Sequence, residues 1–260
     1  MNKIYNTPYG TVYIPVESQM ITVRTSGGFD SALLLYMVAQ TCAETNPNAI
    51  IQPITVVRAN PDDDRTWLYR VDNRPIVDTI IDWVRKEIPV ADIRDKQWLD
   101  AINWWENGSA TYLAAQKNLV SQNYNPIRKA EIPNNQVCRV HDYNGVTKNP
   151  PVPMTIDNMH QYREVKRDHN DPNSPAVAID SCTVVHNANG DDCRYVEPFR
   201  NADKRVTMWL ADNLGILDTL DKITRSCEGD GHKTDNWTKT CNTCWWCQER
   251  EWAYREIIND

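Results

Sequence analysis

Six consecutive residues near the amino end have the types needed to hold a phosphate group. The stretch 26–31 reads Ser-Gly-Gly-Phe-Asp-Ser. Because glycine has no Cβ, the backbone N–H groups of Gly27 and Gly28 can converge on an anion, and a following helix would add the positive end of its dipole. The hydroxyls of Ser26 and Ser31 offer further donors. The pattern favours a phosphate site, and an ordinary Gly-Gly turn with a Ser or Asp helix cap is the alternative.

Asp30 lies inside this stretch, and its charge has the wrong sign for direct contact with phosphate. A carboxylate at this place is suited to hold Mg²⁺, which would bridge to the phosphate oxygens. The stretch is not a Walker A loop, because the chain has no G-x-x-x-x-G-K-[ST]. It is not a dinucleotide-binding fingerprint either, since the only G-x-G, at Gly229 and Gly231, follows no predicted strand. We therefore expect a phosphate loop of another kind, with Mg²⁺ as its cation.

Four of the eight cysteines lie near the carboxyl end with the spacing of a metal site. Cys227, Cys241, Cys244 and Cys247 read C-x13-C-x2-C-x2-C. Four thiolates match the tetrahedral shell of structural Zn²⁺, which leaves no position open for a reacting water. The spacing therefore predicts a structural zinc site that ties the tail of the chain to the domain. Two disulfides, free thiols and an iron–sulfur cluster are the alternatives for the same set.

A phosphate loop needs a strand before it and a helix after it, and the residue pattern predicts both. Residues 21–25 alternate as a strand does, and residues 30–43 have apolar side chains at four-residue steps on one face. Residues 50–57 predict a second, buried strand that starts properly after Pro53. This order is a βαβ unit, which builds parallel sheets with ligands at the carboxyl ends of the strands.

Periodic patterns further along the chain predict more helices and short strands. Helices are expected at 76–88, 99–122, 203–214 and 249–258. Short strands are expected at 176–179 and 183–186. Seven of the fifteen prolines fall between residues 126 and 175, so an irregular insertion or lid is expected there.

Together these elements predict an α/β fold: a twisted parallel sheet with helices on both faces and a carboxyl-terminal zinc-binding segment. We expect residues 1–225 to form the nucleotide domain, with the insertion at about 126–175, and residues 226–260 to form the four-cysteine segment and a terminal helix. No apolar run approaches the ~20 residues of a membrane span, and the pattern of a signal peptide is missing. We therefore expect a cytoplasmic protein with no membrane partner.

The charge of the chain restricts its partners. The formal net charge of −7 argues against broad binding to a nucleic-acid backbone, which needs an excess of Lys and Arg, so no direct nucleic-acid partner is expected. A small anionic substrate fits, because a few backbone amides and one Mg²⁺ can outweigh the global field inside a pocket. A homodimer is the default expectation for the assembly.

The sequence Ser-Gly-Gly-x-Asp-Ser after an apolar strand resembles the signature of the PP-loop ATP pyrophosphatases. Members of this superfamily cleave ATP between its α and β phosphates, usually to adenylate a substrate. The resemblance implies an adenine nucleotide alpha hydrolase-like fold, with ATP and Mg²⁺ as cofactors. The predicted nucleotide-binding residues are Thr25, Ser26, Gly27, Gly28, Phe29, Asp30, Ser31, Val57 and Arg58.

The loop at one end and the four cysteines at the other together resemble the 7-cyano-7-deazaguanine synthase family. The Arg-Ser lead-in before Cys227 and the pair of Pro198 and Lys204 add to this resemblance. It implies that ATP activates the carboxylate of 7-carboxy-7-deazaguanine as an acyl adenylate, and that ammonia displaces AMP to give an amide. A second activation then gives the nitrile, in deazapurine (queuosine-type) biosynthesis for nucleic-acid modification.

The same resemblance implies that Asp30, Ser31 and Lys204 are catalytic. Asp30 would position Mg²⁺, and Lys204 would offset phosphate charge. Two other functions remain open. A PP-loop sulfur transferase or tRNA-modifying enzyme would need a catalytic cysteine near the loop and a basic surface, and the net charge of −7 counts against it. A nucleotide-binding, zinc-stabilised interaction protein without catalysis is the third interpretation.

Overall fold

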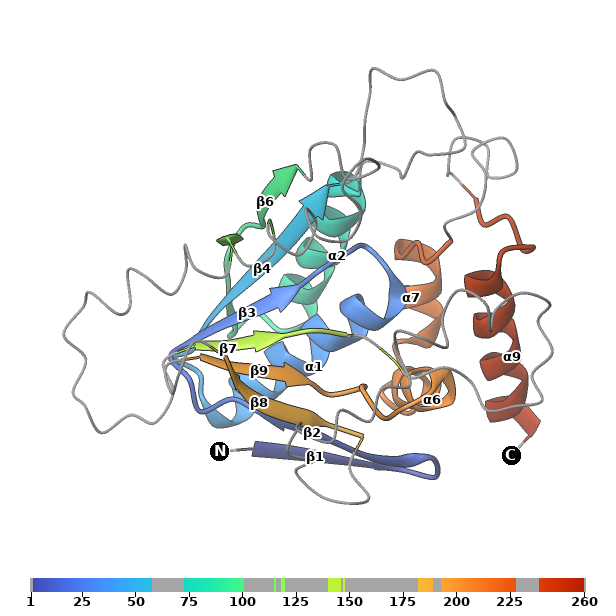
Figure 1. The fold of residues 1–260 in the computed structure, drawn as a ribbon, viewed down its shortest axis with the longest axis horizontal. Coiled ribbons are helices and arrows are strands. Elements are labelled where there is room, and N and C mark those ends of the chain that lie inside the picture. Colours follow the sequence, from blue (N-terminus) through green and yellow to red (C-terminus); the bar gives the residue numbers. More distant parts are fainter. Residues whose placement is uncertain are drawn as a thin grey trace.

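The centre of the protein is a mostly parallel sheet, seven-stranded in the part of the chain that the structure describes (Figure 1). The computed structural model describes residues 2–57, 73–100, 115, 118–119, 140–145, 147, 182–188, 193–227 and 239–259. The sheet contains β3 (Met20–Arg24), β4 (Ile50–Val57), β5 (Asp92–Ile93), β6 (Gln97–Asp100), β7 (Val140–Tyr143), β8 (Val184–Ala188) and β9 (Cys193–Glu197). The strand order is β5-β4-β3-β7-β9-β8, with β6 also paired to β4, and only the β8–β9 pairing is antiparallel.

Five described helices accompany the sheet. They are α1 (Phe29–Thr45), α2 (Arg74–Glu87), α6 (Lys204–Asn213), α7 (Leu217–Ile223) and α9 (Trp245–Asn259). α1 contacts α2, α6 and α7, which places these four helices in one layer beside the sheet, while α9 packs on α6 (Figure 1). The stacked rings of Tyr36 and Trp83, 5.3 Å apart, join α1 to α2. The predicted α/β fold, a parallel sheet with helices, is confirmed; a helical layer on the opposite face stays a prediction.

The β4 strand begins at Ile50 and not after Pro53, so the expected late start is wrong. The backbone of Pro53 faces the outer side of β4, because Ile51, two residues earlier, accepts a hydrogen bond there from Arg94 N at 2.8 Å. On that side β5 pairs with residues 50–51 and β6 pairs with residues 54–57. Residue 53 falls between these two partners, so no ladder requires the N–H that proline lacks.

The β7 strand corrects the expected irregular insertion at 126–175. Residues 140–143 lie in that range, yet they form a strand between β3 and β9. Its polar side chains hide the strand pattern, because their partners lie far away in the sequence. Asp142 accepts from Arg24 Nη2 at 2.5 Å and from Thr22 Oγ1 at 2.9 Å, and His141 Nδ1 lies 2.8 Å from Pro15 O. Of the remaining insertion, only residues 144, 145 and 147 are described.

An antiparallel hairpin that the sequence analysis did not predict precedes the sheet. It consists of β1 (Asn2–Thr7) and β2 (Gly10–Pro15), and it packs on α1 and α6. Val12 and Ile14 are fully buried. Pro15 O accepts from both His141 and Tyr143, which fastens the end of the hairpin to β7.

The other predicted elements have mixed outcomes. The helices expected at 30–43, 76–88 and 203–214 and the strand expected at 183–186 are confirmed, and Gly215 ends α6 with φ +70°. The terminal helix begins at Trp245, four residues before its expected start at 249. The helix expected from residue 99 is wrong at its start, because β6 extends through Asp100 along the edge of β4; most of residues 101–122 and all of 176–179 lie outside the described residues. No described helix has the length and apolarity to cross a lipid bilayer.

Candidate functional site

The loop 26–31, the predicted phosphate site, lies where the strand order of the sheet reverses. From β3 the chain passes through α1 to β4 on one side, whereas β7 and β9 lie on the other side of β3. In open parallel sheets, ligands bind in the crevice outside the carboxyl ends of the strands at such a reversal. The residues that follow β3, β7 and β9 therefore define the candidate site. They are the loop 26–31, residues 144–145 and Lys204.

The loop is closed by its own hydroxyls. Ser31 Oγ donates to Gly28 O at 2.9 Å and accepts from Ser26 N at 3.2 Å, and the two serine Oγ atoms lie 3.2 Å apart. Gly27 has φ +84°, a conformation that favours glycine, and a Cβ there would lie 3.3 Å from Ile76 Cγ2. Gly28 then caps the amino end of α1. The loop thus turns tightly from β3 into the positive end of the helix.

Lys204 reaches this loop from the far end of the chain. It opens α6, its side chain is only 4% exposed, and its Nζ donates to Asp30 Oδ2 at 2.6 Å. The ammonium also lies 5.6 Å from the centre of the Phe29 ring. The structure therefore brings together Asp30 and Lys204, two of the three predicted catalytic residues, beside Ser31.

Several polar atoms around the loop are buried without a hydrogen-bond partner. Among the described residues there are five such side-chain atoms, and three belong to the loop or to segments that contact it: Asp30 Oδ1, Asn73 Oδ1 and Thr147 Oγ1. A buried acceptor or donor left unpaired costs about 1–3 kcal/mol of stability. A polar ligand or an ion bound beside such atoms would compensate that cost. Asp30 Oδ1 in particular is suited to a cation, since its companion oxygen is already held by Lys204.

The remaining predicted nucleotide-binding residues have other surroundings. Thr25 is 2% exposed and joins β3 to β4, because its N–H donates to Ile54 O at 2.9 Å. Val57 is buried at the carboxyl end of β4. Arg58 lies outside the described residues. The structure thus gathers 26–31 and Lys204, whereas Thr25 and Val57 have structural contacts at the ends of their strands.

Four residues at the site were missed as site residues by the sequence analysis. A Cβ on Gly145 would lie 3.3 Å from the backbone of Asp30 and Ser31, so this glycine lets the segment after β7 approach the loop. Asn73 Nδ2 donates to Ser26 O at 2.9 Å. The other two are Arg225 and Ser226, which contact the loop from the segment after α7. Gly145 could not be found because β7 itself was not predicted.

The four predicted metal ligands come together at the carboxyl end. The Sγ atoms of Cys227, Cys241, Cys244 and Cys247 all lie within 4.8 Å of one another. Cys244 Sγ lies 3.8 Å from Cys227 Sγ and 3.5 Å from Cys247 Sγ. A tetrahedron with bonds of about 2.3 Å has edges of about 3.8 Å, so the spacing fits a zinc shell. The cluster could therefore hold a metal ion.

The protonation of these thiols also suits a cation. Burial raises the pKa of Cys241, but hydrogen bonds from the backbone N–H groups of Thr243 and Cys244 outweigh it, and the pKa falls below its usual value. The pKa of Cys247 is raised, first by its hydrogen bond with Cys244 and then by burial and by the neighbouring thiolates. Four crowded thiolates repel one another, and a bound cation removes that cost.

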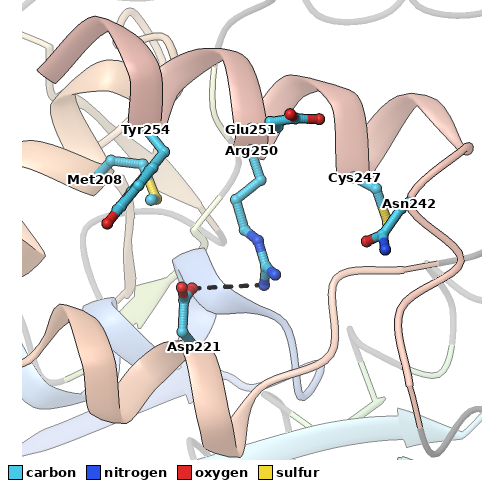
Figure 2. A pocket seen from close by; sticks show the side chains of 7 residues that line it. All are labelled: Met208, Asp221, Asn242, Cys247, Arg250, Glu251 and Tyr254. Carbon is cyan, nitrogen blue, oxygen red and sulfur yellow. Dashed lines mark ion pairs between the residues drawn. The ribbon is translucent and has the colours of Figure 1, made fainter. Parts of the chain in front are cut away.

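A groove of about 390 Å³ lies beside the cysteine cluster, between α9 and the helices α6 and α7 (Figure 2). Its lining residues are Met208, Asp221, Asn242, Cys247, Arg250, Glu251 and Tyr254. Arg250 Nη1 lies 3.6 Å from Asp221 Oδ1 and bridges α9 to α7. This ion pair across the groove attaches the terminal helix to the rest of the protein.

Comparison with known proteins does not identify a family for this chain. No protein-family model matches this chain, and none of the curated proteins matches it. Among solved structures, the chain is similar to a crystal structure of phosphoadenylyl-sulfate (PAPS) reductase from Candida auris in a phosphate complex. The two share 10% sequence identity over 82% of this chain and 81% of the other, with a TM-score of 0.37. A likeness of this degree does not establish a common fold, so the fold described above rests on the strand order alone.

Proposed function

We propose that this protein is an ATP pyrophosphatase of the PP-loop type, which cleaves ATP between the α and β phosphates and adenylates a substrate. The observation that carries the proposal is the Asp30–Lys204 pair. It puts a buried ammonium and a carboxylate with one unpaired oxygen at the loop, where α1 begins and the strand order reverses. An ordinary Gly-Gly turn needs no such pair.

Each part has a task in this proposal. The amino end of α1 and the glycine backbone bind the pyrophosphate, and Ser26, whose side chain is exposed, adds a hydroxyl. Lys204 offsets the charge that develops on the leaving group, because a pre-positioned ammonium stabilises it in surroundings of low dielectric. Asp30 Oδ1 would hold Mg²⁺, which neutralises phosphate charge when bound. Because the pyrophosphate is held in a fixed position, the substrate can attack the α-phosphorus in line with the leaving group.

The proposed substrate is 7-carboxy-7-deazaguanine with ammonia, supported by the pairing of the SGGxDS loop with the four-cysteine cluster. A carboxylate oxygen of the substrate attacks the α-phosphorus, and pyrophosphate leaves. Ammonia then attacks the acyl carbon, AMP leaves, and a proton is released to give the amide. A second ATP activates the amide oxygen in the same way, and loss of AMP and of both N–H protons of the amide yields the nitrile. Zn²⁺ is the proposed occupant of the cysteine cluster, and its role is structural.

The described cysteines do not favour sulfur transfer. Burial raises the pKa of Cys42 to about 12, and burial, with Asp203 adding to it, raises that of Cys182 to about 11. Neither is therefore a ready thiolate at neutral pH. Cys193 begins β9 and so lies at the end of that strand opposite to the loop, and the other four described cysteines form the cysteine cluster. Outside the cysteine cluster, the described cysteines thus offer no activated thiol beside the loop.

Incubation of the purified protein with ATP, Mg²⁺, ammonia and 7-carboxy-7-deazaguanine tests the proposal. AMP and pyrophosphate are expected, with a nitrile or amide product by mass spectrometry, and Asp30→Ala should abolish both. Formation of ADP and phosphate would overturn the PP-loop assignment. AMP and pyrophosphate formed with other carboxylates, but not with this one, would retain the chemistry and reject the proposed substrate.

A further inference from the structure

Residues 224–227 contact the phosphate loop and the cysteine cluster at the same time. Arg225 N donates to Gly27 O at 2.8 Å, and Ser226 Oγ accepts from Phe29 N at 3.1 Å. The next residue, Cys227, is one of the four clustered cysteines. A single short segment therefore links the two motifs, although Phe29 and Ser226 are 197 residues apart in the sequence.

The contacts of this segment are at the part of the loop that would bind phosphate. Phe29 is the first residue of α1. Its N–H is one of the donors in the first turn that have no carbonyl partner within the helix. Ser226 Oγ also lies 3.6 Å from the place a Cβ would take on Gly28. The hydroxyl thus lies against the glycine backbone and the positive end of the helix. A shift of Ser226 would change the donors that the loop presents to an anion.

The segment is held in place from both of its ends. On one side it continues α7, where Thr224 N and Thr224 Oγ1 both bond to Leu220 O, at 3.0 and 2.7 Å. On the other side, Cys227 Sγ accepts from Cys241 N at 3.3 Å within the cluster. The cluster is in turn attached through α9, whose Arg250 pairs with Asp221 of α7 (Figure 2). Cys227 therefore depends on the cluster for its position.

We propose that metal held by the four cysteines positions the phosphate loop, with Ser226 and Arg225 as the positioning residues. Metal–sulfur bonds fix Cys227, and the covalent chain then fixes the hydroxyl and the backbone N–H that hold Phe29 and Gly27. Without metal, no bond joins the four sulfur atoms, so Cys227 loses this anchor and the two contacts with the loop weaken. The inference rests on the proposed function only where nucleotide binding is the readout.

The first experiment removes zinc with a chelator, removes the chelator by desalting, and measures hydrogen exchange in a peptide that covers residues 26–31. Exchange should become about tenfold faster without zinc and return when zinc is added back. The dissociation constant of MgATP, measured by calorimetry on the same samples, should rise about tenfold. Unchanged exchange and unchanged MgATP affinity in the zinc-free protein would overturn the inference.

Variants separate this effect from general unfolding. Ser226→Ala should keep one zinc per chain, speed exchange in 26–31 and weaken MgATP binding, while Ser226→Thr should restore both. Thr240→Ala is the matched control, because it removes a hydroxyl beside the cluster that bonds to Asn242 Oδ1 at 2.9 Å and has no described contact with the loop. Far-UV circular dichroism will reveal whether zinc removal unfolds the chain. In that case the Ser226 variants alone decide: an exchange rate in residues 26–31 of Ser226→Ala equal to that of the wild type rejects the inference.

The same measurements keep two failures apart. Zinc-loaded protein that shows no MgATP binding would reject the proposed function, while the exchange data would still test the link between cluster and loop. An MgATP dissociation constant that changes neither with zinc removal nor in Ser226→Ala would reject the link, while the proposed function would be retained.

Discussion

Lys204 Nζ donates a hydrogen bond to Asp30 Oδ2 at 2.6 Å, although 174 residues separate them in the chain. Asp30 lies in the first turn of α1 after β3, and Lys204 opens α6 after β9. The two strands flank β7 in the sheet, so the topology brings their carboxyl ends together. The fold itself thereby fixes a charge pair at the loop, which is what electrostatic preorganisation requires.

The first prediction concerns the energy of this pair. Lys204→Met should lower the free energy of unfolding by about 3 kcal/mol, because it leaves the carboxylate of Asp30 largely buried without its cation. The double variant Asp30→Asn with Lys204→Met should recover most of that loss, since neither charge then remains. Urea unfolding of the wild type, both single variants and the double variant gives the coupling energy.

Activity should not follow stability in this series. If the pair serves phosphate chemistry, the double variant stays without pyrophosphate release even though its stability returns. Recovery of pyrophosphate release together with stability would show that the pair is only structural.

The second prediction compares two glycines. Gly145→Ala would place a Cβ 3.3 Å from backbone atoms of Asp30 and Ser31, so the loop must shift, and MgATP affinity should fall about tenfold. Gly215→Ala is the control, because Gly215 has φ +70° but no atom within 4 Å of the new Cβ. It should cost about 1 kcal/mol of stability through backbone strain and leave MgATP affinity unchanged. Equal MgATP affinity in the two variants would contradict the role given to Gly145.

The third prediction concerns metal content. We expect one zinc per chain by elemental analysis, lost in Cys244→Ser, because Cys244 Sγ is close to both Cys227 Sγ and Cys247 Sγ. Cys42→Ser and Cys182→Ser are controls with buried cysteines outside the cluster, and they should retain the metal. An absorbance band of an iron–sulfur cluster in anaerobically purified protein would instead favour iron.

Local patterns predict the βαβ unit and the helix that follows it well, but they miss the leading hairpin and the centre of the sheet. The βαβ unit from β3 to β4 follows from apolar periodicity and two glycines, all within 40 residues of sequence. β7 is different, because two of its four residues are His141 and Asp142, and their charges and polar atoms are matched by Arg24 and by Pro15 O. Such long-range compensation leaves no local pattern, so an expected irregular segment proved to be a central strand.

The candidate site divides in the same way. The loop residues and the cysteine cluster follow from short spacings, because the ligand geometry of each is mostly local. The approach of Lys204 to Asp30 was expected only from the resemblance to a known family, since no periodicity connects positions 30 and 204. The contacts of Ser226 and Gly145 with the loop depend on how separate segments pack, and sequence spacing does not report that.

The last prediction concerns pH. His141 is fully buried in β7, and burial lowers its pKa to about 4, although its hydrogen bond with Pro15 O acts in the opposite direction. Because the folded pKa lies below the unfolded value of about 6.5, the unfolded chain binds more protons between these two values. Stability is therefore complete above pH 6.5 and falls as the pH drops toward 4. Glu17 and Arg194 are the charged neighbours with opposite effects on this pKa.

The expected loss for His141 is about 2 kcal/mol between pH 7.5 and pH 5, a window in which most carboxylates stay ionised. His141→Asn retains a donor for Pro15 O and removes the titration, so its free energy of unfolding should change little over the same window. Urea unfolding of both proteins at pH 7.5, 6 and 5 makes the comparison. A wild-type curve as flat as that of the variant would mean that the folded protein protonates His141 as readily as the unfolded chain does. Among the described residues, Glu17 is the acidic neighbour that would stabilise the buried imidazolium.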